Sequence, residues 1–160
     1  MNENISNAQK YDNYKEQFVR LRRAMDNRFY LEALFIEYAI IEDRTKSILV
    51  HAGKYEAYLK KRGKYQETID SKVKYIKGFA AEKKSLLNRY FGDALLDDIL
   101  VWKEERNKMV HALLNQVLST TDIEHLADTG SDYCKSLRNR VTNYKRALNR
   151  RKDKIQSHRR

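Results

Sequence analysis

Apolar side chains recur at spacings of three and four residues along most of this 160-residue chain, and no proline interrupts them. Such spacing lines up the apolar residues on one face of an α-helix, which proline would break. Only five glycines are present, so few positions favour the tight turns that connect strands. The sequence therefore predicts an all-α fold. Its length and its 41% hydrophobic content suit one domain, residues 1–160, with a genuine core.

Glycines and capping residues divide the pattern into helices. Gly53 and Gly63 are natural stops, Asp70 or Ser71 can cap a helix, and Gly130 is expected to interrupt the last one. The sequence TDIE at 121–124 fits a capping box. The expected helices cover about 12–27, 30–51, a short stretch before Gly63, 70–90 (weakened slightly by Gly78), 93–117, and 121 onward. We predict an up-and-down bundle of four long helices with short additional ones.

The net charge of +11 is concentrated at one end of the chain. Residues 131–160 hold eleven Lys or Arg against two acids, while the other 130 residues are nearly neutral. A basic helix or tail of this kind attracts a polyanion such as nucleic acid. A solvated basic face is the alternative. The residues expected to bind nucleic acid are Arg138, Arg140, Lys145, Arg146, Arg150, Arg151 and Lys152.

The stretch RNKMVH, residues 106–111, places polar groups inside an apolar-periodic segment. Asn107 and His111 are one helical turn apart and share a face, whereas Arg106 and His111 point about 140° apart and lie ~7.5 Å apart along the axis. Ordinary structural roles would be a histidine satisfied in the core and an arginine paired on the surface. A compact site would need a helix distortion or a second copy of the helix.

This R-N-x-x-x-H spacing on a late helix resembles the HEPN superfamily of prokaryotic toxins and RNA-processing nucleases, whose signature Arg106, Asn107 and His111 fill. In EDRTK, Glu42 and Lys46 match the E-x-x-x-K spacing often seen there. The resemblance implies a metal-independent endoribonuclease that acts as a homodimer on RNA, with Arg106, His111 and Asn107 catalytic and Glu42 and Lys46 supporting. In one toxin–antitoxin branch of the superfamily, a tyrosine that can be modified stands two residues after the histidine. Leu113 occupies that position here, which puts regulation by tyrosine modification in doubt.

The chemistry of these side chains agrees with that implication. A histidine can move a proton to or from the ribose 2′-OH or the departing 5′ oxygen, and an arginine offers a permanently charged fork to a phosphate. Asn107 can orient either group. Glu42 could pair with Lys46 one turn away or with Arg106 across the bundle, although an i,i+4 pair is also an ordinary surface stabiliser.

Other chemistries lack their signatures. The four histidines share no metal-ligand spacing with Cys134, and Asp93, Asp97 and Asp98 read as helix-start acids. Phosphate-binding glycine loops and serine-hydrolase elbows are missing. We expect no metal, no cofactor and no membrane contact, and a cytoplasmic protein. The rival to the nuclease is an inactive helical adaptor that binds nucleic acid through its basic end; an antitoxin or defence-system partner, including an acidic antitoxin on the basic face, is also open.

Overall fold

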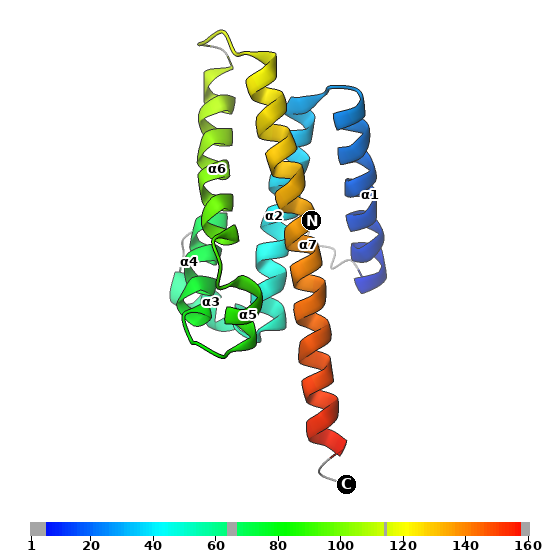
Figure 1. Cartoon of the computed structure of the whole chain (residues 1–160), viewed down its shortest axis with the longest axis vertical. Coiled ribbons are helices and arrows are strands. Elements are labelled where there is room, and N and C mark those ends of the chain that lie inside the picture. The colour runs from blue at the N-terminus through cyan, green and yellow to red at the C-terminus, as the bar shows by residue number, and fades with distance from the viewer. Residues whose placement is uncertain (1–5, 64–66, 114, 158–160) are drawn as a thin grey trace. The chain divides into compact units, whose positions relative to one another are not determined.

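The computed structural model describes residues 6–63, 67–113 and 115–157, and these residues form seven helices and no strand (Figure 1). The all-α prediction is confirmed. Four helices have 18 or more residues and three are shorter. They are α1 (Asn7–Asp26), α2 (Tyr30–His51), α3 (Tyr55–Arg62), α4 (Ile69–Ala80), α5 (Leu86–Phe91), α6 (Leu95–Ala112) and α7 (Thr120–Ser157).

Local capping explains where the first helices begin and end. Ser6 and Gln9 form a capping box at the start of α1. Between α1 and α2 the backbone turns through Arg28, which has a φ of 60°. Gly53 and Gly63 follow α2 and α3 with φ of 65° and 66°, the left-handed conformation that glycine adopts without strain. The expected ends at these glycines are confirmed.

The predicted helix over 70–90 is instead two helices, α4 and α5. Thr68, rather than Asp70 or Ser71, caps α4, and Ser71 serves as the third helical residue of its capping box. Ser85 accepts a hydrogen bond from the Asn88 N–H and so begins α5. Lys84, just before it, has a φ of 74°, which a continuous helix cannot accommodate. A local capping residue therefore overrides the helical period of the apolar side chains.

The last two helices also differ from expectation. α6 ends at Ala112 rather than near 117, and Val117 is fully exposed, so its apolar spacing has nothing to pack against. α7 begins at Thr120, which places TDIE inside its first turn. Gly130 does not interrupt α7, which continues through it for 38 residues in all.

A close approach explains Gly130. A Cβ at this position would meet the Glu37 carboxylate, and it would lie 2.7 Å from a ring carbon of Trp102. Glu37 and Trp102 are almost fully buried. Gly130 is therefore the residue that lets α7 pack closely on α2 and α6.

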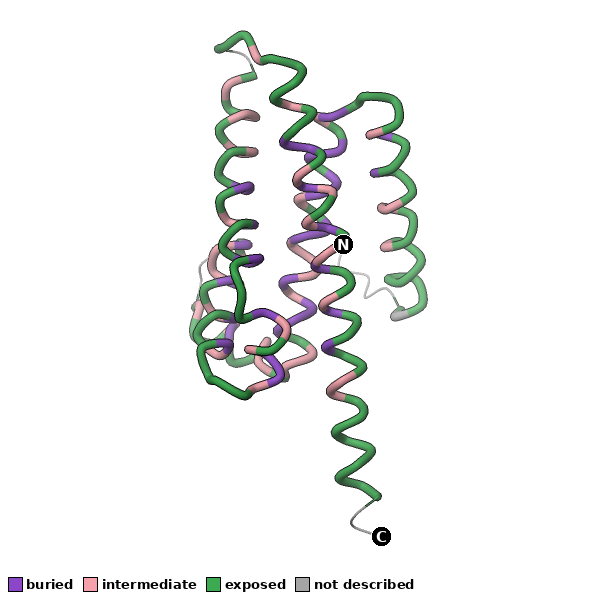
Figure 2. The backbone as a smooth tube through the Cα atoms, in the orientation of Figure 1, coloured by how far each residue is buried: buried purple, intermediate pink, exposed green. Residues whose placement is uncertain are grey.

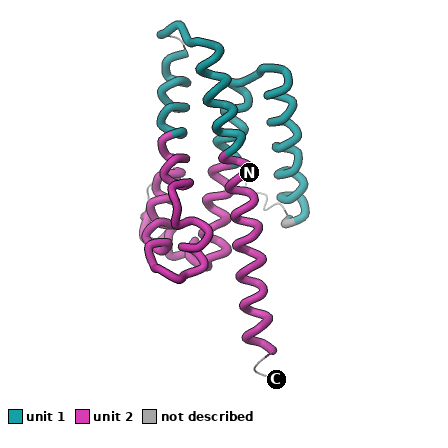
Figure 3. Tube along the Cα trace, in the orientation of Figure 1, with its two compact units in different colours: residues 1–40, 102–132 teal, residues 41–101, 133–160 magenta. Residues whose placement is uncertain are grey.

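The residues cluster into two compact units, one of residues 1–40 and 102–132 and the other of 41–101 and 133–160 (Figure 3). The helices α2, α6 and α7 contribute residues to both units, and the single-domain reading stays a prediction. The core of the first unit includes Leu21, Ala24, Ala33, Leu34, Ile40, Trp102 and Ala127. That of the second includes Ile41, Ile48, Ile69, Val73, Ile76, Phe91, Leu96, Ile99, Leu137 and Tyr144.

In the second unit, the burial of α7 ends well before the helix does (Figure 2). Leu137, Val141 and Tyr144 are buried in succession on one face. Beyond Tyr144, every described residue is exposed except the half-buried Ala147 and Leu148. The last turns of α7 are thus a basic helix with little packing around it.

Candidate functional site

Arg106 lies on α6 in the first unit and rests against two aromatic rings of α2. Its guanidinium carbon is 4.7 Å from the centroid of the Phe35 ring and 4.9 Å from that of Tyr38. Phe35 and Tyr38 are three residues apart, so they share one face of α2. Contacts of this kind between a guanidinium and aromatic rings contribute ~0.5–2 kcal/mol each, depending on desolvation.

Arg106 makes one side-chain hydrogen bond to the described residues. Nη1 donates to Asn107 Oδ1 at 3.2 Å, and no carboxylate pairs with the guanidinium in the described part of the chain. The Nε–H is buried and finds no acceptor among the described residues. Partial burial lowers the pKa of Arg106, which remains a cation at neutral pH. Among the described residues, this fixed positive charge is held by two rings and an amide and has no carboxylate partner.

His111 lies in the last turn of α6 and is exposed, one turn after the half-buried Asn107. The structure therefore brings Arg106 and Asn107 together. Arg106 leans onto α2, whereas His111 faces solvent, as the 140° separation on an ideal helix predicts. A single copy of α6 does not place the guanidinium and the imidazole on one phosphate.

Glu42 and Lys46 belong to the second unit, where each has a partner of its own. Glu42 Oε1 accepts from Lys72 Nζ at 3.2 Å, and Lys72 is only 2% exposed. Lys46 Nζ lies 4.8 Å from the centroid of the Tyr55 ring, and a hydrogen bond with Tyr55 raises the pKa of Lys46. A Glu42–Lys46 pair, one of the two pairings considered for Glu42, does not form between these described residues, and the contact with Lys72 gives Glu42 a structural role.

The basic residues of α7 fall into two groups. Arg138, Lys145, Arg146, Arg150, Arg151 and Lys152 are exposed. Arg140 is half-buried, pairs with Asp93 at 2.6 Å and donates to the Tyr90 carbonyl at 3.1 Å, which ties α7 to the start of α6. Tyr144 is 3% exposed and packs edge-on against Tyr90 and Phe91. Tyr144 is therefore an anchor of α7 and does not offer its ring to a ligand.

Phe35 and Tyr38 contact the candidate residue Arg106, and sequence reasoning did not place them there. Both fit the apolar period of the helix expected over 30–51. The helical period does not indicate that 55% of Phe35 is exposed beside the guanidinium. Two neighbouring aromatic residues on a helix that packs against an arginine-bearing helix would have been the pattern to look for.

Two further properties of the described residues bear on the site. No group of three or more His, Cys, Asp or Glu side chains there is arranged to hold a metal ion. No described helix is both long and apolar enough to cross a membrane. The chain matches no protein-family model, no curated protein and no solved structure.

Proposed function

We propose that this protein is a metal-independent endoribonuclease of the HEPN type, built as an up-and-down helical bundle and active as a homodimer. Arg106 and His111 act on the scissile phosphate, and Asn107 orients the guanidinium. The observation that carries the proposal is the half-buried Arg106: it is held between two rings and an amide, has no carboxylate partner among the described residues, and precedes an exposed histidine by five residues.

The pairing state of Arg106 separates a site from a surface ion pair. An arginine that serves only the fold usually satisfies its fork with carboxylates or carbonyls. Within the described ranges, the side-chain acceptor of Arg106 is Asn107, and the rings of Phe35 and Tyr38 restrict the position of the guanidinium without neutralising it. A positioned, uncompensated fork is the group that stabilises charge building on a phosphate.

The proposed reaction follows from these groups. The ribose 2′-OH attacks the adjacent phosphorus, the bond from phosphorus to the 5′ oxygen breaks, and the products are a 2′,3′-cyclic phosphate and a 5′-OH. One His111 accepts the 2′-OH proton, and a second His111 donates a proton to the departing 5′ oxygen. The guanidinium donates hydrogen bonds to the non-bridging oxygens as their charge increases.

A second copy of the chain supplies what one helix cannot. Arg106 and His111 of one α6 diverge, so a twofold arrangement of two α6 helices is needed to direct both residue types at one phosphate. The exposed ring of Phe35 next to Arg106 provides apolar surface for a partner to cover. On this proposal the protein sediments as a dimer.

Cleavage of a labelled RNA in EDTA tests the proposal. Arg106→Ala and His111→Ala should each lower the rate by at least about a hundredfold. Arg22→Ala and His125→Ala, which remove the same side chains from exposed positions on α1 and α7, should leave it unchanged. Activity that requires added metal ion, or that survives both site variants, contradicts the assignment.

Mixing the two inactive variants tests the composite site. After subunit exchange, a mixed dimer carries one intact Arg106 and one intact His111, in different chains. If both chains contribute to one site, the mixture should regain a small part of the activity that neither variant has alone, because one intact Arg106 and one of the two proton-transferring His111 side chains then meet at the same phosphate. A mixture as inactive as its components would argue that each chain works by itself.

The exposed basic end of α7 favours a second candidate function, an adaptor that binds nucleic acid without cleaving it. Six basic residues between 145 and 157 face solvent against the one acid Asp153. Such an adaptor would show binding that weakens steeply with salt, no turnover, and loss of binding when residues 138–160 are removed. Substitution of Arg106 would leave that binding intact, which distinguishes it from the nuclease.

A further inference from the structure

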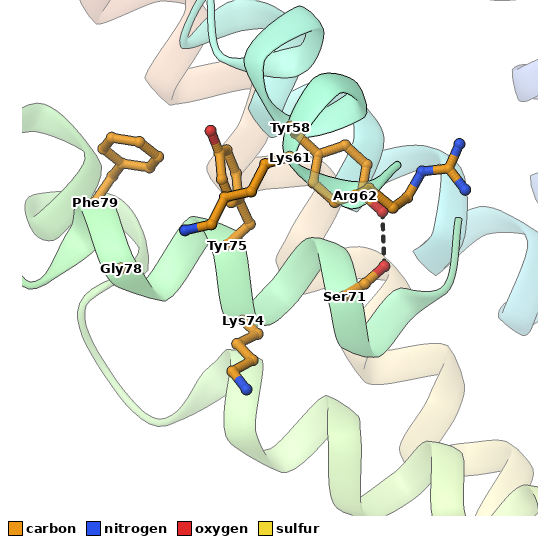
Figure 4. A pocket seen from close by; sticks show the side chains of 8 residues that line it. All are labelled: Tyr58, Lys61, Arg62, Ser71, Lys74, Tyr75, Gly78 and Phe79. Atoms are coloured by element: carbon orange, nitrogen blue, oxygen red, sulfur yellow. Dashed lines mark hydrogen bonds between the residues drawn. The ribbon is translucent and has the colours of Figure 1, made fainter. Parts of the chain in front are cut away.

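A groove of about 650 Å³ lies between α3 and α4 in the second unit (Figure 4). It has no part in the proposed nuclease. Its lining combines aromatic rings, basic side chains and a glycine, and no carboxylate is among them. The lining residues are Tyr58, Lys61, Arg62, Ser71, Lys74, Tyr75, Gly78 and Phe79.

Three aromatic rings form one wall. The Tyr58 and Tyr75 centroids are 5.4 Å apart, and those of Tyr75 and Phe79 are 5.1 Å apart with an interplanar angle of 71°. Tyr58 is buried, and its hydroxyl lies 2.6 Å from the Ser71 hydroxyl, which fixes the inner end of the row. Tyr75 and Phe79 are only half-buried, so part of each ring is open to solvent.

Gly78 sits between Tyr75 and Phe79 on α4 for no reason that the fold supplies. A Cβ added there would have no atom within 4 Å, and Gly78 is not among the glycines with positive φ. A glycine with ordinary helical backbone weakens a helix relative to alanine. It differs from Gly130, whose packing forbids a side chain. What Gly78 does provide is bare backbone beside two open rings, where a flat ligand can approach closely.

Positive charge surrounds these rings. Lys61 Nζ is 5.7 Å from the centroid of the Tyr75 ring, and the Lys61 side chain passes in front of that ring in Figure 4. The Lys74 side chain points away from the rings. Lys54 Nζ lies 4.8 Å from the Phe79 centroid. Phe79 also borders a second hollow of about 460 Å³ whose basic residues are Lys54, Lys83, Lys84 and Arg151, with Glu82 the acid among its lining. The basic surface thus continues past the rings and reaches α7.

We propose that the groove between α3 and α4 binds an unpaired nucleotide of a single-stranded nucleic acid. The base stacks on the Phe79 ring next to Gly78 and meets the Tyr75 ring edge-on, because these two rings are inclined at 71°, and Lys61 and Lys54 contact the flanking phosphates. Open aromatic rings combined with a basic track are what single strands require, because every base has a face to stack and every linkage a charge. A strand, rather than a free nucleotide, fits the continuation of the basic surface into the second hollow.

Binding of a fluorescent 12-nucleotide 2′-O-methyl RNA to the full-length protein tests the groove. This strand lacks a free 2′-OH, so it cannot be cut by the proposed nuclease, and binding is measured apart from cleavage. Gly78→Leu places a side chain in the groove. Gly78 is exposed and has open space around it, so the new side chain does not disturb the packing. Phe79→Ala removes the stacking ring, and Lys61→Ala removes one phosphate contact. Circular dichroism confirms that each variant is folded.

We expect Gly78→Leu and Phe79→Ala each to weaken binding roughly tenfold, as loss of one stacked base does. Lys61→Ala should weaken it less and lower the slope of log affinity against log salt by about one. The controls Phe29→Ala and Arg22→Ala, which remove an exposed ring and an exposed charge from the first unit, should bind normally.

Three results would overturn the proposal: no binding by the wild-type protein, unchanged binding by the folded Gly78→Leu variant, or equal competition by a duplex or by free AMP at the same nucleotide concentration. Loss of cleavage in Arg106→Ala with retained binding of the methylated strand would separate the groove from the nuclease site. Either proposal can therefore fail alone.

Discussion

Two glycines inside helices, Gly78 and Gly130, should respond in opposite directions to the same substitution. Replacing a mid-helix glycine by alanine stabilises a helix by about 1 kcal/mol, through the lost backbone freedom of glycine in the unfolded chain. At Gly78 the new methyl group meets no atom within 4 Å, so this gain is kept. Gly78→Ala should raise the free energy of unfolding by about 0.5–1 kcal/mol.

At Gly130 the same methyl group enters a filled space. It would contact the Glu37 carboxylate and lie 2.7 Å from a Trp102 ring carbon, well inside ordinary contact distance. Neither neighbour can move into solvent, since Glu37 is 0% and Trp102 is 1% exposed. Overpacking of this kind costs about 1–3 kcal/mol. After the helix gain is subtracted, Gly130→Ala should destabilise by up to about 2 kcal/mol, and the two variants should differ by about 1–3 kcal/mol.

Urea unfolding followed by circular dichroism measures both variants against wild type. Fluorescence of Trp102, the only tryptophan in the sequence, reports separately on the packing around Gly130. On heating, a change of 1 kcal/mol corresponds to about 2–4 °C in Tm for a chain of this size. If Gly130→Ala proves as stabilising as Gly78→Ala, the close packing of α7 against Glu37 and Trp102 is refuted.

Three further predictions concern other parts of the chain. Glu42→Gln should lower the free energy of unfolding by about 1 kcal/mol, because Lys72, which is only 2% exposed, donates a hydrogen bond to the Glu42 carboxylate. In a Lys72→Met background this loss should largely vanish. A double-mutant cycle measured by urea unfolding tests both expectations. The hydrogen bond to Glu124 raises the pKa of Tyr30, and burial raises the pKa of Tyr55 and of Tyr144. The contribution of these neutral tyrosines to the free energy of unfolding is therefore complete below pH 10, their ordinary pKa, and is lost as the pH rises through the raised folded-state values. The urea midpoint should fall over that pH range, and it should fall less steeply in Tyr30→Phe. Removing residues 149–160 should leave the urea midpoint unchanged, since 149–157 are exposed, but should weaken oligonucleotide binding and its salt dependence; a lower midpoint would show that the segment packs.

Helix positions were predictable where apolar spacing and glycine agreed. The bounds of α2 follow from apolar residues that keep helical period between the Arg28 turn and Gly53. Prediction failed where a polar residue decided the outcome. Ser85 begins a new helix inside a stretch whose apolar residues keep helical period, because one capping hydrogen bond and a left-handed residue before it are invisible to that period.

The sequence proposes candidate site residues but does not reveal their surroundings. Spacing along α6 proposes Arg106, Asn107 and His111, whose catalytic role stays a prediction, and helix geometry alone gives the divergence of Arg106 from His111. The rings that hold Arg106 come from α2, some seventy residues earlier, and only tertiary packing brings them together. The partner of Glu42 was equally unpredictable from spacing. Glu42 bonds Lys72, which lies thirty residues away on α4, and not Lys46, which lies one turn away on α2.

The end of α7 beyond Tyr144 has consequences for how the protein responds to its ionic surroundings. Arg146 and Arg150, and likewise Arg150 and Lys154, stand one turn apart and repel each other, which disfavours the helix they belong to. A segment of about a dozen residues with little packing is marginal as a helix in water. The helical content of this segment should therefore rise with ionic strength or with a bound polyanion. The last three turns of α7 would then be helical when their charge is neutralised and unfolded when it is not, while the buried part of α7 stays helical.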